Sequence, residues 1–232
     1  NMLAVILGHT ELALDRLVSI DPLHADLMEI RKAAERSAGL VRQLLAFARK
    51  QTVSPRVLDL NAVVDGMLKM LRRLIGEDVN LAWRPGTDLR PVKIDPSQLD
   101  QVLTNLCVNA RDSIDGVGTI TIETRNGDID EAFCATHPGA VPGGYVTLDV
   151  ADSGCGMSRD VLEHLFDPFY TTKGAGRGTG LRLATVFGIV KQHDGFVDVS
   201  SLEGHGAIFR LCAPALAAAA VGQAFGSLLN SP

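Results

Sequence analysis

The sequence has 232 residues, of which 46% are hydrophobic, and it carries a formal net charge of −5. This length allows one sizeable core with a smaller helical unit. The mildly acidic balance excludes a general nucleic-acid binder, which needs a basic surface. No apolar run approaches the roughly 20 residues that span a bilayer, and the first residues lack the pattern of a secretory leader.

Four widely spaced cysteines form no CxxC pair, which predicts a reduced, cytoplasmic protein without a zinc site. These cysteines are Cys107, Cys134, Cys155 and Cys212. The chain starts inside an apparent helix, so we expect it to be a fragment of a longer protein.

Two helical patterns come first along the chain. Residues 2–19 repeat apolar side chains at helical spacing, and a second stripe runs from 27 to 48 with a charged opposite face. Between them, Asp21 and Pro22 read as a helix cap followed by a proline in the first turn. One hairpin cannot bury such broad stripes, so we expect residues 1–50 to pair with a second copy as a four-helix bundle. The first stripe consists of Leu3, Leu7, Thr10, Leu14 and Leu17.

A second unit follows a break at Pro55, which ends any helix that continues from the hairpin. We place a linker at residues 51–58, a domain at 59–215 and an Ala-rich tail or linker at 216–232. Within the domain, helical and alternating patterns mix, which predicts an α+β sandwich with antiparallel neighbours and helices on one face. Helices are expected from Asn61 to Ile75, 95–114, 158–166 and 180–192, and strands at 78–83, 91–94, 118–129, 144–152, 195–201 and 207–214.

The first cluster with chemical potential is the helix that contains Asn105 and Asn109. The two asparagines are four residues apart and lie on one side of the helix. Asparagine is a poor helix former, so a pair in an apolar helix needs a reason. Taken alone, a solvated surface pair is favoured. The alternative is a pair of neutral oxygen ligands for a metal–phosphate group.

Two further clusters are glycine-rich. Asp152 ends a strand and is followed by Gly154 and Gly156, an arrangement that suits an acceptor for an exocyclic amine but also an ordinary turn. The second loop, 174–180, has glycines at alternate positions before a helix whose N–H groups can bind an anion. Its spacing fits neither the dinucleotide-binding nor the P-loop fingerprint. Lys173 and Arg177 favour a phosphate-holding lid over a plain flexible hairpin.

The order of these clusters is more specific than any one of them. An Asn-x-x-x-Asn helix, then DxGxG, "FDPFYTTK", GxGxGL and "SLEGHGAIF" resembles the ATP-binding domain of bacterial sensor histidine kinases. The resemblance covers 59 to about 215. The preceding hairpin resembles the dimerisation and phosphotransfer region of the branch whose acceptor motif reads HDFNN, in which hybrid kinases with a fused receiver domain are frequent.

The resemblance implies a GHKL-type α/β sandwich and transfer of the γ-phosphoryl group of ATP to a histidine, then to a response-regulator aspartate. It implies ATP and Mg²⁺ as cofactors, with Asn109 as the metal ligand, and a homodimer that meets a receiver domain. Neither nucleic acid nor a membrane segment is expected. The implied ATP-binding residues are Asn105, Asn109, Asp112, Asp152, Gly154, Gly156, Phe166, Phe169, Lys173, Arg177, Gly178, Thr179, Gly180 and Leu181.

Three departures from the family pattern stand out. If Asn1 is the second asparagine of HDFNN, the acceptor histidine lies upstream of this chain, and His9 faces another direction on the helix. Relatives read GTGLGL where this chain has GTGLRL, and we expect Arg182 to crowd the lid, although its charge could instead attract phosphates. Relatives usually carry threonine at Ala207, whose lost hydroxyl would cost about 1 kcal/mol.

These departures leave an alternative function open. The leading hypothesis is the catalytic core of a sensor histidine kinase. The alternative is a degenerate kinase that serves as a dimeric regulatory or scaffold module, with little nucleotide turnover. An ATP-driven clamp like the type II topoisomerases is disfavoured, because an Ala-rich segment and not a transducer domain follows the sandwich.

Overall fold

The computed structural model describes residues 2–17, 21–48, 53–136, 140–173 and 179–216. The chain divides into two compact units, one of residues 1–52 with 173–179 and one of residues 53–172 with 180–232. Among the described residues, no helix combines the length and apolarity that crossing a membrane requires.

The first unit contains a helical hairpin made of α1 (Met2–Leu14) and α2 (Pro22–Ala48). As predicted, α2 begins at Pro22, and the Asp21 carboxylate accepts a hydrogen bond from the backbone N–H of Leu23 at 2.9 Å. The first helix is shorter than predicted, because the chain turns after Leu14.

The predicted stripe of α1 is the better-buried face of that helix. Thr10 is buried, with its hydroxyl donating to the carbonyl oxygen of Ile6, and the four predicted leucines are half-buried. His9 is exposed, as expected for a surface histidine. Several large apolar side chains on the hairpin are nevertheless exposed, namely Met2, Val5, Ile6, Leu12, Leu23 and Ile30.

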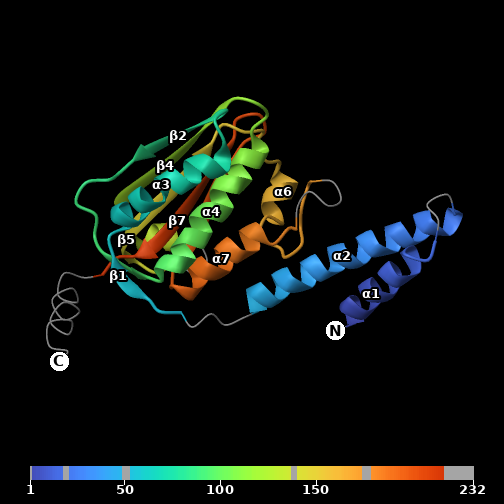
Figure 1. Cartoon of the computed structure of the whole chain (residues 1–232). Coiled ribbons are helices and arrows are strands. Elements are labelled where there is room, and N and C mark those ends of the chain that lie inside the picture. Colours follow the sequence, from blue (N-terminus) through green and yellow to red (C-terminus); the bar gives the residue numbers. More distant parts are fainter. Residues whose placement is uncertain (1, 18–20, 49–52, 137–139, 174–178, 217–232) are drawn as a thin grey trace. The chain divides into compact units, whose positions relative to one another are not determined.

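The second unit is a mixed five-stranded sheet covered by helices, which confirms the predicted α+β sandwich (Figure 1). The strand order is β2-β4-β5-β7-β6, in which β2 and β4 are parallel and the other neighbours are antiparallel. The strands are β2 (Val79–Arg84), β4 (Gly118–Ile129), β5 (Gly143–Asp152), β6 (Phe196–Ser201) and β7 (Ala207–Pro214).

Three helices lie over one face of this sheet (Figure 1). They are α3 (Leu60–Ile75), α4 (Pro96–Ser113) and α7 (Arg182–Gln192). Their apolar faces form the main core together with alternate residues of the strands. Fully buried examples are Val64 of α3, Leu103 of α4 and Val146 of β5. Burial of one face of each element is what holds the sandwich together.

Local capping explains where the two longest helices of this unit begin. Asp95 caps α4 by accepting from the N–H of Ser97, as the Asp-Pro signal predicts. The prediction that Asn61 caps α3 is wrong. Asp59 is the cap, and Asn61 instead donates its side-chain amide to the carbonyl oxygen of Gly86 at 2.9 Å.

Three short elements complete the second unit. The strand β1 (Arg56–Leu58) lies within the predicted linker and pairs antiparallel with β3 (Val92–Ile94). The helices α5 (Glu131–Thr136) and α6 (Arg159–Glu163) flank β5 in the sequence, and only α6 was predicted. On the sheet face opposite the main core, Phe133 of α5 packs against a small apolar cluster of Tyr145, Phe196 and Cys212.

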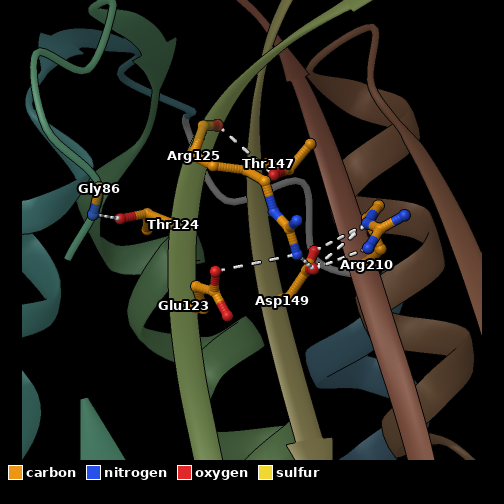
Figure 2. A network of polar contacts seen from close by, with 7 residues as sticks. All are labelled: Gly86, Glu123, Thr124, Arg125, Thr147, Asp149 and Arg210. Carbon is orange, nitrogen blue, oxygen red and sulfur yellow. Dashed lines mark hydrogen bonds and ion pairs between the residues drawn. The ribbon is translucent and has the colours of Figure 1, made fainter. Parts of the chain in front are cut away.

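The same opposite face carries an ionic network that ties three neighbouring strands (Figure 2). Asp149 of β5 is only 4% exposed and accepts hydrogen bonds from Arg125 of β4 at 2.6 Å and from Arg210 of β7 at 2.9 Å. The bond to Asp149 raises the pKa of the Arg210 guanidinium. A nearly buried carboxylate with two partners thus joins β4, β5 and β7 on this face, and removal of either partner would leave its charge less compensated.

The cysteines behave as core or surface residues in the described part of the chain. All four are free thiols. Burial raises the pKa of the Cys107 and Cys212 thiols to about 12, so both remain protonated and act as small apolar side chains.

The exposed apolar side chains of the hairpin lead to the first prediction, that the chain dimerises through residues 2–48. Leu12→Glu together with Ile30→Glu should shift the protein toward monomer, because charge replaces apolar surface that a partner helix would bury. Sedimentation at tens of micromolar measures the change, and Glu11→Gln on the same helix is the control. A wild-type monomer at that concentration would contradict the prediction.

Candidate functional site

Asp152 lies at the C-terminal end of β5, where the strand leaves the sheet. One carboxylate oxygen accepts from the backbone N–H of Gly154 at 2.8 Å and lies 3.1 Å from the hydroxyl oxygen of Ser113. The side chain is half-buried. The carboxylate is therefore oriented by the loop that follows the strand and by the last turn of α4.

The environment of Asp152 is unfavourable for a charge. Burial raises the pKa of its carboxyl above the ordinary range, although the backbone N–H groups of Gly154 and Ala207 and the Ser113 hydroxyl favour the ionised form. A carboxylate held where its own ionisation is penalised costs stability and is typical of a functional site.

Ser113 is a neighbour of Asp152 that the sequence analysis missed. Its hydroxyl lies 2.7 Å from the carbonyl oxygen of Ala110 and 3.1 Å from Asp152, so two acceptors compete for one proton. Its own carbonyl oxygen accepts from the N–H of Cys155 at 3.0 Å. The signal was its position four residues after Asn109, which continues the polar side of the helix.

The glycines after Asp152 are required by close packing. A Cβ atom on Gly154 would collide with Ser113, and one on Gly156 would collide with the backbone of Leu202. Gly156 also has a φ of 67°, in the left-handed region that favours glycine. These contacts hold the loop between α4 and the β6–β7 hairpin.

One face of α4 presents polar side chains along the helix. Asn105, Asn109 and Asp112 follow each other at steps of four and three, which places them on one side. The opposite side is buried, with Leu103 and Leu106 inside the core. Asn105 donates its amide to the carbonyl oxygen of Arg182 at 3.4 Å. Among the described residues, no hydrogen-bond partner is found for the half-buried Asn109 side chain.

The two ends of the predicted lid are joined. The N–H of Phe169 donates to the carbonyl oxygen of Gly180 at 3.0 Å. Both residues have positive φ, 70° for Phe169 and 64° for Gly180, and a Cβ atom on Gly180 would collide with the backbone of Phe169. Phe166, one of the ATP-binding residues that the resemblance implies, stacks on Phe187 of α7 with ring centroids 5.0 Å apart.

Some predicted residues are not brought to this site in the described structure. Arg177 and Gly178 lie outside the described residues. Lys173 and Thr179 belong to the other compact unit, so their roles remain predictions. Leu181 is 6% exposed and its carbonyl oxygen accepts from Thr185, so its side chain is part of the protein interior.

The two departures within the domain have clear positions. Ala207 is buried and is the register partner of Asp152 in the β5–β7 ladder. Arg182 begins α7, and its guanidinium lies 2.8 Å from a carboxylate oxygen of Asp112. Its side chain is 43% exposed, so there is room for it on α4. The expected crowding concerns residues 174–178, which lie outside the described ones.

The donor set fits a metal that arrives with a phosphate ligand. Among the described residues, no three His, Cys, Asp or Glu side chains gather as a metal-binding cluster. Mg²⁺ needs only one or two protein oxygens when phosphates and waters supply the rest. The amide oxygen of Asn109, on the same face as Asp112, is suited to that role.

These parts match what a purine nucleotide requires of a protein. Asp152 offers an acceptor for an exocyclic amine, α4 offers neutral and acidic oxygens, and a backbone hydrogen bond joins Phe169 to Gly180. The fold and the site define the class of nucleotide-binding α/β sandwiches.

Comparison with known proteins identifies the family within this class. A family model described as "Histidine kinase-, DNA gyrase B-, and HSP90-like ATPase" matches residues 94–217, which is more than half of the chain. The chain therefore belongs to this family.

Individual relatives agree with this placement. The chain is 44% identical over 216 residues to the sensor kinase CckA of Brucella abortus, covering 93% of the chain and 23% of that protein. It is 31% identical over 218 residues to the sensor histidine kinase ZraS of Salmonella typhi, covering 94% and 43%. The chain thus spans less than half the length of these curated relatives.

Solved structures show the same fold. The structure of full-length ShkA in complex with AMPPNP matches with a TM-score of 0.61 and 25% identity, covering 93% of this chain and 43% of that one. The Acinetobacter baumannii histidine kinase AdeS matches with a TM-score of 0.57 and 20% identity, covering 93% and 96%.

The second prediction concerns Asp152 and pH. The folded carboxyl has the higher pKa and so binds protons more readily than the unfolded one. The contribution of Asp152 to the free energy of unfolding should therefore fall as pH rises from about 4 through the raised pKa. Asp152→Asn removes this dependence. The free energy of unfolding of the variant should therefore increase relative to that of the wild type as pH rises.

Urea denaturation at about pH 4 and pH 7 measures the difference. The exposed Asp115→Asn is the matched control, because its carboxyl remains in solvent. An equal difference between Asp152→Asn and the wild type at both pH values would show that burial of the charge is not what costs stability.

Proposed function

We propose that this chain is the catalytic core of a two-component sensor histidine kinase. It binds ATP with Mg²⁺ and transfers the γ-phosphoryl group to a histidine, from which the group passes to an aspartate of a response-regulator receiver domain. The observation that carries the proposal is the carboxylate of Asp152, held by Ser113 and Gly154 in surroundings that raise its pKa.

The comparisons support a nucleotide as the ligand. The family described for residues 94–217 is one of ATPases, and the ShkA structure is titled as a complex with AMPPNP. CckA and ZraS are named sensor kinases, which supports phosphoryl transfer as the reaction.

Each residue of the site has a role in this proposal. Asp152 accepts from the adenine amine, and Gly154 and Gly156 shape the base pocket by letting the loop pack closely against its neighbours. Asn109 ligates the magnesium ion, which neutralises charge on the phosphates, and Asn105 lies beside it. The N–H groups that begin α7 face the phosphates. Catalysis is then mainly positioning and charge stabilisation.

The hairpin supplies the dimer in this proposal. Its exposed apolar side chains are suited to a partner hairpin, and a four-helix bundle would present an acceptor histidine to the ATP-binding domain. The receiver domain of the response regulator is the proposed second partner.

Ala207 favours a second candidate, a degenerate kinase that acts as a dimeric regulatory module. This residue lies directly opposite Asp152 in the sheet and has no hydroxyl to offer a nucleotide. The loss of one hydrogen bond is about 1 kcal/mol, which weakens binding without abolishing it.

The third prediction is that ATP–Mg²⁺ binding depends on Asp152 and Asn109. Asp152→Asn replaces an acceptor oxygen by a donor and leaves the adenine amine badly paired. An unpaired buried group costs about 1–3 kcal/mol, or roughly five- to a hundredfold in affinity. Asn109→Ala should weaken ATP more than adenosine, because it removes a metal ligand and no base contact.

Titration calorimetry on the full chain measures both variants. Asn80→Ala, an exposed asparagine on β2, and Asp115→Asn are the matched controls and should bind as the wild type does. Unchanged ATP affinity in both Asp152→Asn and Asn109→Ala would refute the assignment of the site.

The fourth prediction separates a kinase from its degenerate alternative. When the residues before Asn1 are supplied from an HDFNN-type sensor kinase, the chimera should form acid-labile phosphohistidine with radiolabelled ATP. Asp152→Asn in the same chimera should label much more slowly at subsaturating ATP, because binding limits the rate. A chimera that binds ATP but acquires no label supports the degenerate alternative.

A further inference from the structure

Arg182 makes a specific set of contacts across two helices. It is the first residue of α7, yet its guanidinium reaches α4, where Nη1 lies 2.8 Å from Oδ2 of Asp112. Its backbone carbonyl oxygen accepts from the amide of Asn105, at 3.4 Å. The arginine is thus bound to α4 at two points that are seven residues apart.

Asn109 lies between these two points on the same face of α4. Seven residues of helix rise about 10 Å. The side chains of Asn105 and Asp112 cover part of this distance, and the arginine side chain covers the rest. The side chain of Arg182 therefore runs along the proposed metal–phosphate position, and its guanidinium lies one turn from Asn109.

A cation at the first position of a helix is disfavoured by the helix dipole. The first turn of α7 has no acidic residue, and its N-cap, Leu181, supplies no side-chain hydrogen bond. The N-terminus of α7 and the guanidinium therefore both bring positive charge to the polar face of α4. In the described structure, Asp112 is the carboxylate that offsets them.

The ion pair is suited to exchange. The side chains of Arg182 and Asp112 are 43% and 35% exposed, and exposed pairs of this kind are weak. A guanidinium has five N–H donors, and a triphosphate offers more charge and more acceptor oxygens than one carboxylate. A triphosphate at Asn109 can take the guanidinium from Asp112.

We propose that Arg182 is a phosphate-binding residue of the nucleotide site, held over α4 by Asp112 until a triphosphate replaces that carboxylate. This inference rests on the proposed function. It adds a phosphate-binding side chain at a position where the family motif has glycine. It is the alternative to the expected crowding of the lid, and the partly exposed position of the side chain along α4 favours it.

Calorimetry with ATP and AMP in the presence of Mg²⁺ tests the proposal on the full chain. Arg182→Gln should weaken the affinity for ATP about tenfold and change the affinity for AMP by less than about twofold, because only the longer phosphate chain reaches the guanidinium. Asp112→Asn should tighten ATP about threefold, because it removes the competing carboxylate. Arg182→Lys should retain part of the ATP affinity, since lysine keeps the positive charge but lacks the paired N–H donors of the guanidinium.

The control is Arg90→Gln, whose guanidinium also lies 2.8 Å from an aspartate oxygen, that of Asp128, outside the site. It should leave both affinities unchanged, and thermal unfolding checks that each variant is folded. Tighter ATP binding by Arg182→Gln, or equal weakening of ATP and AMP, overturns the inference in favour of crowding or a purely structural tether. Weaker ATP binding by Asp112→Asn also overturns it.

Failure of the proposed function gives a different result. If the wild type binds no ATP, or if Asp152→Asn binds it as well as the wild type, the nucleotide site itself is wrong. If Asp152→Asn weakens ATP binding and Arg182→Gln does not, the nucleotide site is supported and only the proposed role of Arg182 is wrong.

Discussion

The packing of α4 against the sheet is the constraint on which the rest of the domain depends. One side of this helix is buried in the core through Leu103, Leu106 and Cys107, so its rotation about its own axis is fixed. The opposite side then presents Asn105, Asn109 and Asp112 together. Burial of one face thus orients the polar face, and no contact among the polar residues themselves is needed.

Both ends of α4 are also fixed, and this places the helix along its axis. At the start, Asp95 accepts from the backbone N–H groups of Ser54 and Ser97, which holds the pKa of that carboxyl below its usual range. At the end, Ser113 contacts Asp152 and the backbone of Cys155. The position of α4 relative to β5 is therefore fixed. As a result, the fold sets the distance from Asp152 to the side of α4 that carries Asn105 and Asn109.

Asp149 and Asp112 illustrate two different uses of charge. Asp149 is almost fully buried and is held by two arginines from adjacent strands, a rigid arrangement that stabilises the sheet (Figure 2). Asp112 is partly exposed and has Arg182 as a partner on another helix. Desolvation makes breaking the first contact costly, whereas solvent screening makes the second easy to exchange. The stable pair lies on the sheet face away from the site, and the exchangeable pair lies on the proposed phosphate side.

The sequence by itself determined the long helices, the strands of the main sheet and the residue types near Asp152 and on α4. Local signals were sufficient for this, because the Asp95-Pro96 cap, the alternation in β4 and β5 and the glycines after Asp152 act within a few residues. The tertiary structure decided which residues meet. Ser113 and Asp152 are 39 residues apart, and Arg182 and Asp112 are 70 apart. Likewise, β1 became a strand only by pairing with β3. Periodicity specifies which face of an element is apolar, but a partner across the core follows only from the packing of those faces against one another.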